Sequence, residues 1–204
     1  MQAIPQAKSP AGFVDPHIGE PLSRLAEIGP AAKGKGREVV LALGPAFGDA
    51  LATTIGGLGH EEVLEAILTG VASEGIVARI VRVYHSSDCA AIGYVGARLS
   101  GSGIGIGLQS RGTAVIHQKD LAPLNNLELF PQSPSLTLAT YEEIGRNAAR
   151  YALGLATVPV AVEIDNGARL RLIVKTALLH RRETDAVRPE RPPQELRFDW
   201  EPDL

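Results

Sequence analysis

The stretch LSGSGIGIGLQSRGTAVIHQKDLAPLNNLELFPQ, residues 99–132, decides the fold, because it opens with glycines that alternate with single residues. Alternate residues of a strand point to the same face, so Gly101, Gly103, Gly105 and Gly107 would leave one face without side chains. A bare face lets another part of the protein, or a ligand, approach the backbone closely. The pattern alone leaves both possibilities open.

The segments that precede this stretch predict a parallel sheet. Residues 39–43 form a short apolar run that ends in Gly-Pro, which is typical of a buried strand closed by a turn. Apolar residues recur along one helical face of 60–72, and residues 76–84 are rich in Val and Ile. Strand, helix and strand in this order indicate a βαβ unit. We therefore expect an α/β fold with an open, mainly parallel sheet flanked by helices.

The same periodicities predict the remaining elements. We expect helices over 89–99 and 137–155, and strands over 103–108 and 113–117. The period of residues 171–179 does not decide between strand and helix.

The Pro and Gly content divides the chain into three parts. Residues 1–36 contain five prolines and five glycines without a sustained period, which predicts a flexible or surface-draped arm. Residues 37–186 carry the predicted sheet and helices and form one domain. Residues 187–204 are rich in proline and charge and predict an extended tail.

The composition excludes several classes of function. The net charge of −3 and the 4% aromatic content argue against a nucleic-acid-binding surface. The sequence contains no run of about 18 apolar residues, so no transmembrane helix is expected. Its first residues lack the basic segment followed by an apolar segment that is typical of a secretory signal. A single cysteine, Cys89, excludes an internal disulfide framework and predicts a cytoplasmic location.

Common catalytic and cofactor motifs are missing. The glycine run does not match G-x-G-x-x-G in any register, and neither a phosphate-binding P-loop nor G-x-S-x-G occurs. The five histidines are dispersed, so we predict no metal site. Asp15 and His17 resemble the D-x-H-x-x-G signature of corrinoid proteins, but Gly19 falls one residue early, so we interpret this segment as a loop. Cys89 is interpreted as a small buried helix residue.

Three places carry candidate binding residues. Asp88 lies at the C-terminal end of a predicted parallel strand, where open α/β sheets bind ligands, and it can also cap the helix that follows. Arg111 lies in a polar turn that leaves the glycine strand. Residues 124–132 mix apolar residues with amides that can satisfy backbone groups or read a ligand.

Long segments of the chain resemble a known family. The block quoted above continues as SPSLTL and is followed by TYEEIGRNAARYA, and GPAFG at 44–48 and SEGIVARIVRVYHSSD at 73–88 fit the same family. Together they resemble the medium (β) subunit of adenosylcobalamin-dependent propanediol or glycerol dehydratase. The similarity runs from about Val39 to Glu183.

The resemblance implies a shared cofactor site in a larger enzyme. In the family, two heterotrimers of large, medium and small subunits assemble, and a reactivating factor serves the complex. The large subunit is a TIM barrel with the substrate and the radical chemistry that converts a 1,2-diol to an aldehyde and water. The medium subunit has a Rossmann-like core and holds the nucleotide side of adenosylcobalamin. The chain would thus be a subunit of a hydro-lyase without catalytic residues of its own.

The resemblance also implies five cofactor-binding residues. The family's strand-end aspartate falls on Asp88, and its lysine falls on Arg111, which replaces a compact ammonium with a planar fork. A leucine and an asparagine of the family fall on Leu124 and Asn126, and an arginine falls on Arg169.

Other interpretations remain open at this point. The small subunit of a dehydratase-reactivating factor, a cofactor-exchange chaperone, has a related fold. A free-standing α/β oxidoreductase would need the dinucleotide fingerprint that is missing here. Preference for propanediol or glycerol depends on the large subunit. Many family members carry an N-terminal helix that directs them to a bacterial microcompartment, and the Pro/Gly-rich arm does not resemble it.

Overall fold

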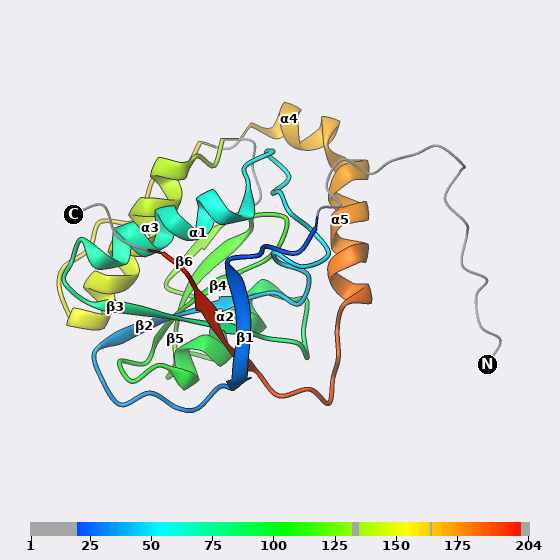
Figure 1. Cartoon of the computed structure of the whole chain (residues 1–204). Helices are drawn as coiled ribbons and strands as arrows, with labels where there is room; N and C mark the ends of the chain where they lie inside the picture. Colours follow the sequence, from blue (N-terminus) through cyan, green and yellow to red (C-terminus); the bar gives the residue numbers. More distant parts are fainter. Residues whose placement is uncertain (1–19, 132–134, 164, 201–204) are drawn as a thin grey trace.

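A seven-stranded sheet forms the centre of the computed structural model, which describes residues 20–131, 135–163 and 165–200 (Figure 1). The predicted arm residues 1–19, with the Asp15–Gly19 segment, lie outside this range. Three parallel strands occupy the middle of the sheet: β2 (Glu38–Leu43), β3 (Val77–Arg82) and β4 (Ile104–Leu108). They confirm the βαβ unit and the open α/β fold.

The expectation of a mainly parallel sheet was wrong. The strand order is β1-β7-β3-β2-β4-β5-β6, and every strand outside the central three pairs antiparallel. The connection from β4 to β5 has only five residues, whereas a parallel crossover needs a dozen or more. The outer strands are β5 (Ala114–Gln118), β6 (Glu128–Phe130), β7 (Gln194–Phe198) and β1 (Leu25–Pro30).

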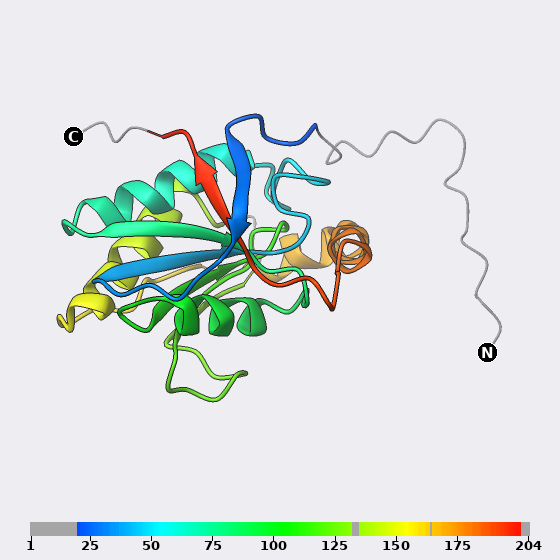
Figure 2. The ribbon, with the colours of Figure 1, turned by 60° about the horizontal axis from the view of Figure 1, so that its bottom comes forward.

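The helices cover both faces of the sheet and one of its edges (Figure 2). α1 (His60–Ala72) and α3 (Leu138–Leu153) pack together on one face, over the main apolar core. α2 (Cys89–Leu99) packs on the other face, where Val40, Ala42 and Val81 are buried. α4 (Asn166–Arg171) and α5 (Ile173–Asp185) lie beside the C-terminal ends of the parallel strands. The undecided segment 171–179 is thus helical.

The bare glycine face of β4 packs against α2 of the same chain. A Cβ atom on Gly105 would lie 2.3 Å from the backbone nitrogen of Ala97, and one on Gly107 would lie 2.5 Å from that of Gly93. The glycines therefore allow a close helix–strand contact. Of the two possibilities left open by the sequence, tight packing is the one that this face shows.

The described parts of both terminal segments belong to the sheet. β1 lies within the predicted arm and β7 within the predicted tail, and the two strands pair with each other. β7 also pairs with β3, so it joins β1 to the centre of the sheet. Neither strand was predicted from the sequence, and the proposed division into domains stays a prediction.

A polar site at the C-terminal ends of the parallel strands

Three turns meet where the parallel strands end, and backbone hydrogen bonds hold them together. The amide of Gly44 donates to the carbonyl of Leu108 at 2.8 Å, and the amide of Val83 donates to Leu43 at 2.9 Å. These bonds join the ends of β2, β3 and β4. This is the edge at which open α/β sheets place ligands.

Asp88 begins α2 and caps it. Its Oδ1 accepts a hydrogen bond from the amide of Ala91 at 2.8 Å, and the residue is exposed. The carboxylate therefore satisfies one free amide of the first helical turn and still faces solvent at the strand end. The predicted capping role is confirmed, and the ligand role stays a prediction.

Arg111 lies near Asp88 in the turn after β4 and is half-buried. Its Nε donates to Oε1 of Gln109 at 3.0 Å, while the Gln109 amide donates to the carbonyl of Ser87. Burial lowers the pKa of Arg111, and the nearby carboxylates of Glu183 and Asp88 oppose this shift. The structure thus brings Asp88 and Arg111 to one edge, where a partly desolvated cation can attract an anion.

Glu183 is a buried carboxylate that the sequence analysis missed. It extends from α5 into the strand ends, where Oε2 accepts from the amide of Ser110 at 3.0 Å and Oε1 from that of Ala46 at 3.4 Å. Burial raises its pKa. A signal was present, because Glu183 follows the buried Leu179 by one helical turn and so interrupts an apolar face with an acid.

His60 holds the same turn from the other side. Its Nδ1 accepts from the amide of Gly48 at 2.9 Å, so its Nε2 carries the hydrogen that is donated to the carbonyl of Ser110 at 2.7 Å. The ring stacks on Phe47 at 3.9 Å, and burial lowers the pKa of His60 to about 4. His60 is therefore a neutral structural group at this edge.

Leu124 and Asn126 lie away from this edge. They belong to the loop between β5 and β6, which extends outward beyond α2 in Figure 2. Because β5 runs antiparallel to β4, its five residues place this loop roughly 14 Å from the strand ends. Leu124 is 77% exposed and Asn126 is half-buried. A ligand that touches both places must extend along the side of the domain.

Arg169 lies on α4 and is exposed. It lines a hollow of about 440 Å³ between α4, α5 and Ile55. The amide of Ile55 donates a hydrogen bond to the carbonyl of Arg111 at 3.0 Å, which connects this hollow to the turn after β4. Three of the five predicted site residues therefore surround the same edge of the sheet: Asp88, Arg111 and Arg169.

Cys89 is buried, its thiol faces the carbonyls of Gly107 and Thr113, and burial raises its pKa, so it is unsuited to nucleophilic attack. Within the part of the chain that the structure describes, no three metal-ligating side chains gather at one point. The helices there are also too short or too polar to traverse a lipid bilayer.

The fold and this site define an α/β domain with a charged, partly buried strand-end site. Residues 44–157 match the family described as "Dehydratase medium subunit", and the chain belongs to this family. The chain is also similar to two solved structures. One is titled "Glycerol dehydratase reactivase" (TM-score 0.48, 18% identity, 63% of this chain and 100% of the other). The second is "Structure of diol dehydratase-reactivating factor complexed with ADP and Mg2+" (TM-score 0.45, 19% identity, 63% and 99%).

Proposed function

We propose that this chain is the medium subunit of an adenosylcobalamin-dependent diol or glycerol dehydratase. In this proposal it holds the nucleotide side of the cofactor against a catalytic large subunit, in a cytoplasmic complex that also contains a small subunit. The observation that carries the proposal is the guanidinium of Arg111, half-buried and fixed beside Asp88 at the strand ends.

The available groups fit the nucleotide side of a cobalamin. This part of the cofactor carries a phosphodiester and lies next to amide side chains of the corrin. Arg111 supplies a cation for the phosphate, while Asp88 and Asn126 supply an acceptor and an amide for polar groups. A cobalamin is large enough to reach from the strand ends to the loop that carries Leu124, roughly 14 Å away.

The chain's own contribution is to position the cofactor. Adenosylcobalamin, when bound, supplies an organic radical, and the large subunit directs it to the substrate. The residues of this chain bind the nucleotide portion at a fixed place. The translational and rotational entropy of the cofactor is therefore lost on binding and does not add to the barrier of the reaction. We propose no proton-transfer role for them, since Cys89 and His60 are both buried and neutral.

The test measures cofactor retention by the assembled complex. Asp88→Ala and Asn126→Ala should each weaken adenosylcobalamin binding about tenfold, the loss expected when a polar contact to a buried ligand is removed. Equilibrium dialysis of the complex with the large and small subunits gives the affinity. Asp185→Asn, an exposed acid at the end of α5, is the matched control. Unchanged affinity in both site variants would refute the assignment of these residues.

A second candidate is the small subunit of a dehydratase-reactivating factor. The family includes reactivase subunits, and two of the solved structures similar to this chain carry such titles, although a likeness at these TM-scores does not distinguish the members. Reconstitution separates the two candidates. A medium subunit completes a dehydratase that lacks its own, whereas a reactivating subunit restores an inactivated complete enzyme and does not replace the missing subunit.

A further inference from the structure

The turn that carries Arg111 is held on both sides by buried groups. The residue before Arg111 is Ser110. Its backbone amide donates to the carboxylate of Glu183, and its carbonyl accepts from the ring of His60. The following carbonyl, of Gly112, accepts from the hydroxyl of Tyr141 at 2.7 Å. The direction in which Arg111 leaves the backbone is therefore set by hydrogen bonds from α1, α3 and α5.

Among these groups, Glu183 comes from the segment farthest along the chain. α5 packs through Leu179 against the turns after β2, and the ammonium of Lys175 donates to the carbonyl of Ile55 at 2.7 Å. Glu183 itself is 2% exposed and lies so close to Gly44 that a Cβ atom there would be 2.0 Å from its Oε1. The carboxylate thus occupies a site built around it at the strand ends.

Packing alone does not explain a buried carboxylate at the strand ends. Removing a carboxylate from water costs several kcal/mol, and an apolar side chain of the same size would pack without this cost. Its two oxygens instead satisfy two backbone amides that the turns leave free, those of Ala46 and Ser110. These are the amides of the turns that follow β2 and β4.

We infer that Glu183 is a positioning residue for the cofactor contact, which holds the amide of Ser110 and thereby orients Arg111. The inference rests on the proposed function. It extends the cofactor site to α5, which itself need not touch the cofactor. The interaction that matters is the hydrogen bond accepted from Ser110. A glutamine oxygen at the same distance can still accept it, although the NH2 group then faces the amide of Ala46, whose weaker contact of 3.4 Å is lost.

Three substitutions of Glu183 vary the length of the side chain, its carboxyl group and its hydrogen-bond acceptor separately. Glu183→Gln keeps an oxygen at the same distance, Glu183→Asp keeps the carboxyl group but withdraws it, and Glu183→Leu replaces it with an apolar side chain that has no acceptor. Each variant is assembled with the large and small subunits, and its affinity for cyanocobalamin, an inert probe, is measured by equilibrium dialysis. The same three changes are also made in an Arg111→Ala background, and Asp185→Asn is the control on the same helix.

We expect Glu183→Gln to bind within about twofold of the unchanged complex, and the Asp and Leu variants to bind about tenfold more weakly. In the Arg111→Ala background, the Asp and Leu changes should have no further effect, because residues that act through one another are not additive. If the Leu variant does not assemble, the Asp variant decides.

Three results from the Glu183 variants would overturn the inference. They are unchanged affinity in the Asp and Leu variants, a loss in the Gln variant as large as in the Leu variant, and equal losses with and without Arg111. The last result would mean that Glu183 only stabilises the domain. If Arg111→Ala alone leaves the affinity unchanged, the proposed cofactor contact fails and the inference with it. If only the Glu183 changes are without effect, the proposed function stands and the inference fails.

Discussion

At the scale of single residues, His60 shows how burial fixes a protonation state. Its Nδ1 accepts from Gly48 and its Nε2 donates to Ser110, so a second proton would face the Gly48 amide. Burial also disfavours the charged ring and lowers the pKa of His60 to about 4. The neutral ring is therefore part of the folded structure at the strand ends.

This pKa predicts a loss of stability in weak acid. The unfolded chain binds a proton at His60 below pH 6.5, whereas the folded chain does so only near pH 4. The contribution of His60 is complete above pH 6.5 and falls by roughly 3 kcal/mol as the pH drops to 4. Urea unfolding of the full chain between pH 7 and pH 4 measures this change.

The matched variant is His60→Gln, which cannot titrate in this range. It should be less stable than the unchanged chain at pH 7, because one of two hydrogen bonds and the stacking on Phe47 are lost. Its stability should then change less between pH 6.5 and pH 4. An identical pH dependence in both proteins would assign the acid effect to other groups.

At the scale of elements, the close contact between α2 and β4 depends on glycine. Gly107→Ala would place a Cβ atom 2.5 Å from the backbone nitrogen of Gly93 and 2.6 Å from the carbonyl of Cys89. Backbone atoms cannot rotate away, so the helix must shift, and we expect a loss of about 2 kcal/mol in the free energy of unfolding.

Gly36→Ala is the control for this prediction, because a Cβ atom there meets nothing within 4 Å. Chemical unfolding of both variants gives the comparison. Equal stability of the Gly107 and Gly36 variants would show that α2 moves away from the sheet without cost.

The elements that the sequence predicted are those whose period is local. The helices at 60–72 and 89–99 were predicted with their observed bounds, since apolar residues mark one face of each. β1 gave no such signal, because a bulge between Glu27 and Gly29 interrupts its pairing and Pro30 ends it. The antiparallel pairings and the burial of Glu183 depend on segments far apart in the chain, which no local period reveals.

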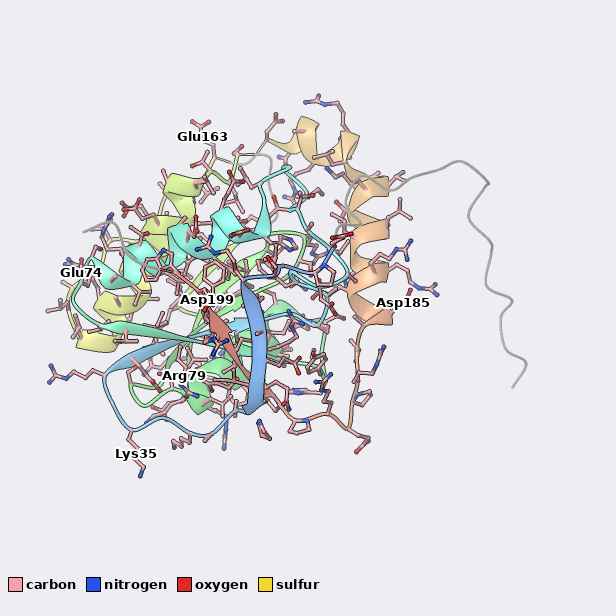
Figure 3. The ribbon with its side chains drawn as sticks, in the orientation of Figure 1. Lys35, Glu74, Arg79, Glu163, Asp185 and Asp199 are labelled. Atoms are coloured by element: carbon pink, nitrogen blue, oxygen red, sulfur yellow. The ribbon has the colours of Figure 1, made fainter. Side chains whose placement is uncertain are left out.

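At the scale of the whole molecule, Arg79 joins β7 and the segment after β1 to the centre of the sheet (Figure 3). It contacts the carboxylates of Glu38 at 3.3 Å and Glu195 at 2.7 Å, and it donates to the carbonyls of Ala32 and Leu99. One guanidinium therefore connects β2, β3 and β7 with the end of α2 and with the loop between β1 and β2.

Arg79→Ala should destabilise the full chain by about 2 kcal/mol, because two half-buried carboxylates and two carbonyls each lose one hydrogen-bonding partner, and Glu195 loses its ion pair. Arg181→Ala, which breaks an exposed ion pair with Asp185 on α5, should cost about 0.5 kcal/mol or less. Thermal unfolding of the two variants measures the difference. A similar effect of both changes would mean that the Arg79 network contributes no more than a surface pair.

The pairing of β1 with β7 has a consequence for synthesis on the ribosome. β1 is among the first described segments to emerge, yet its hydrogen-bonding partner begins about 160 residues later at Gln194. Until β7 is translated, β1 has no strand to pair with, and the side of β3 that binds β7 is also unpaired. Contacts between such distant segments form slowly. Completion of the sheet is thus a late event in folding, because β1 and the open side of β3 both depend on β7.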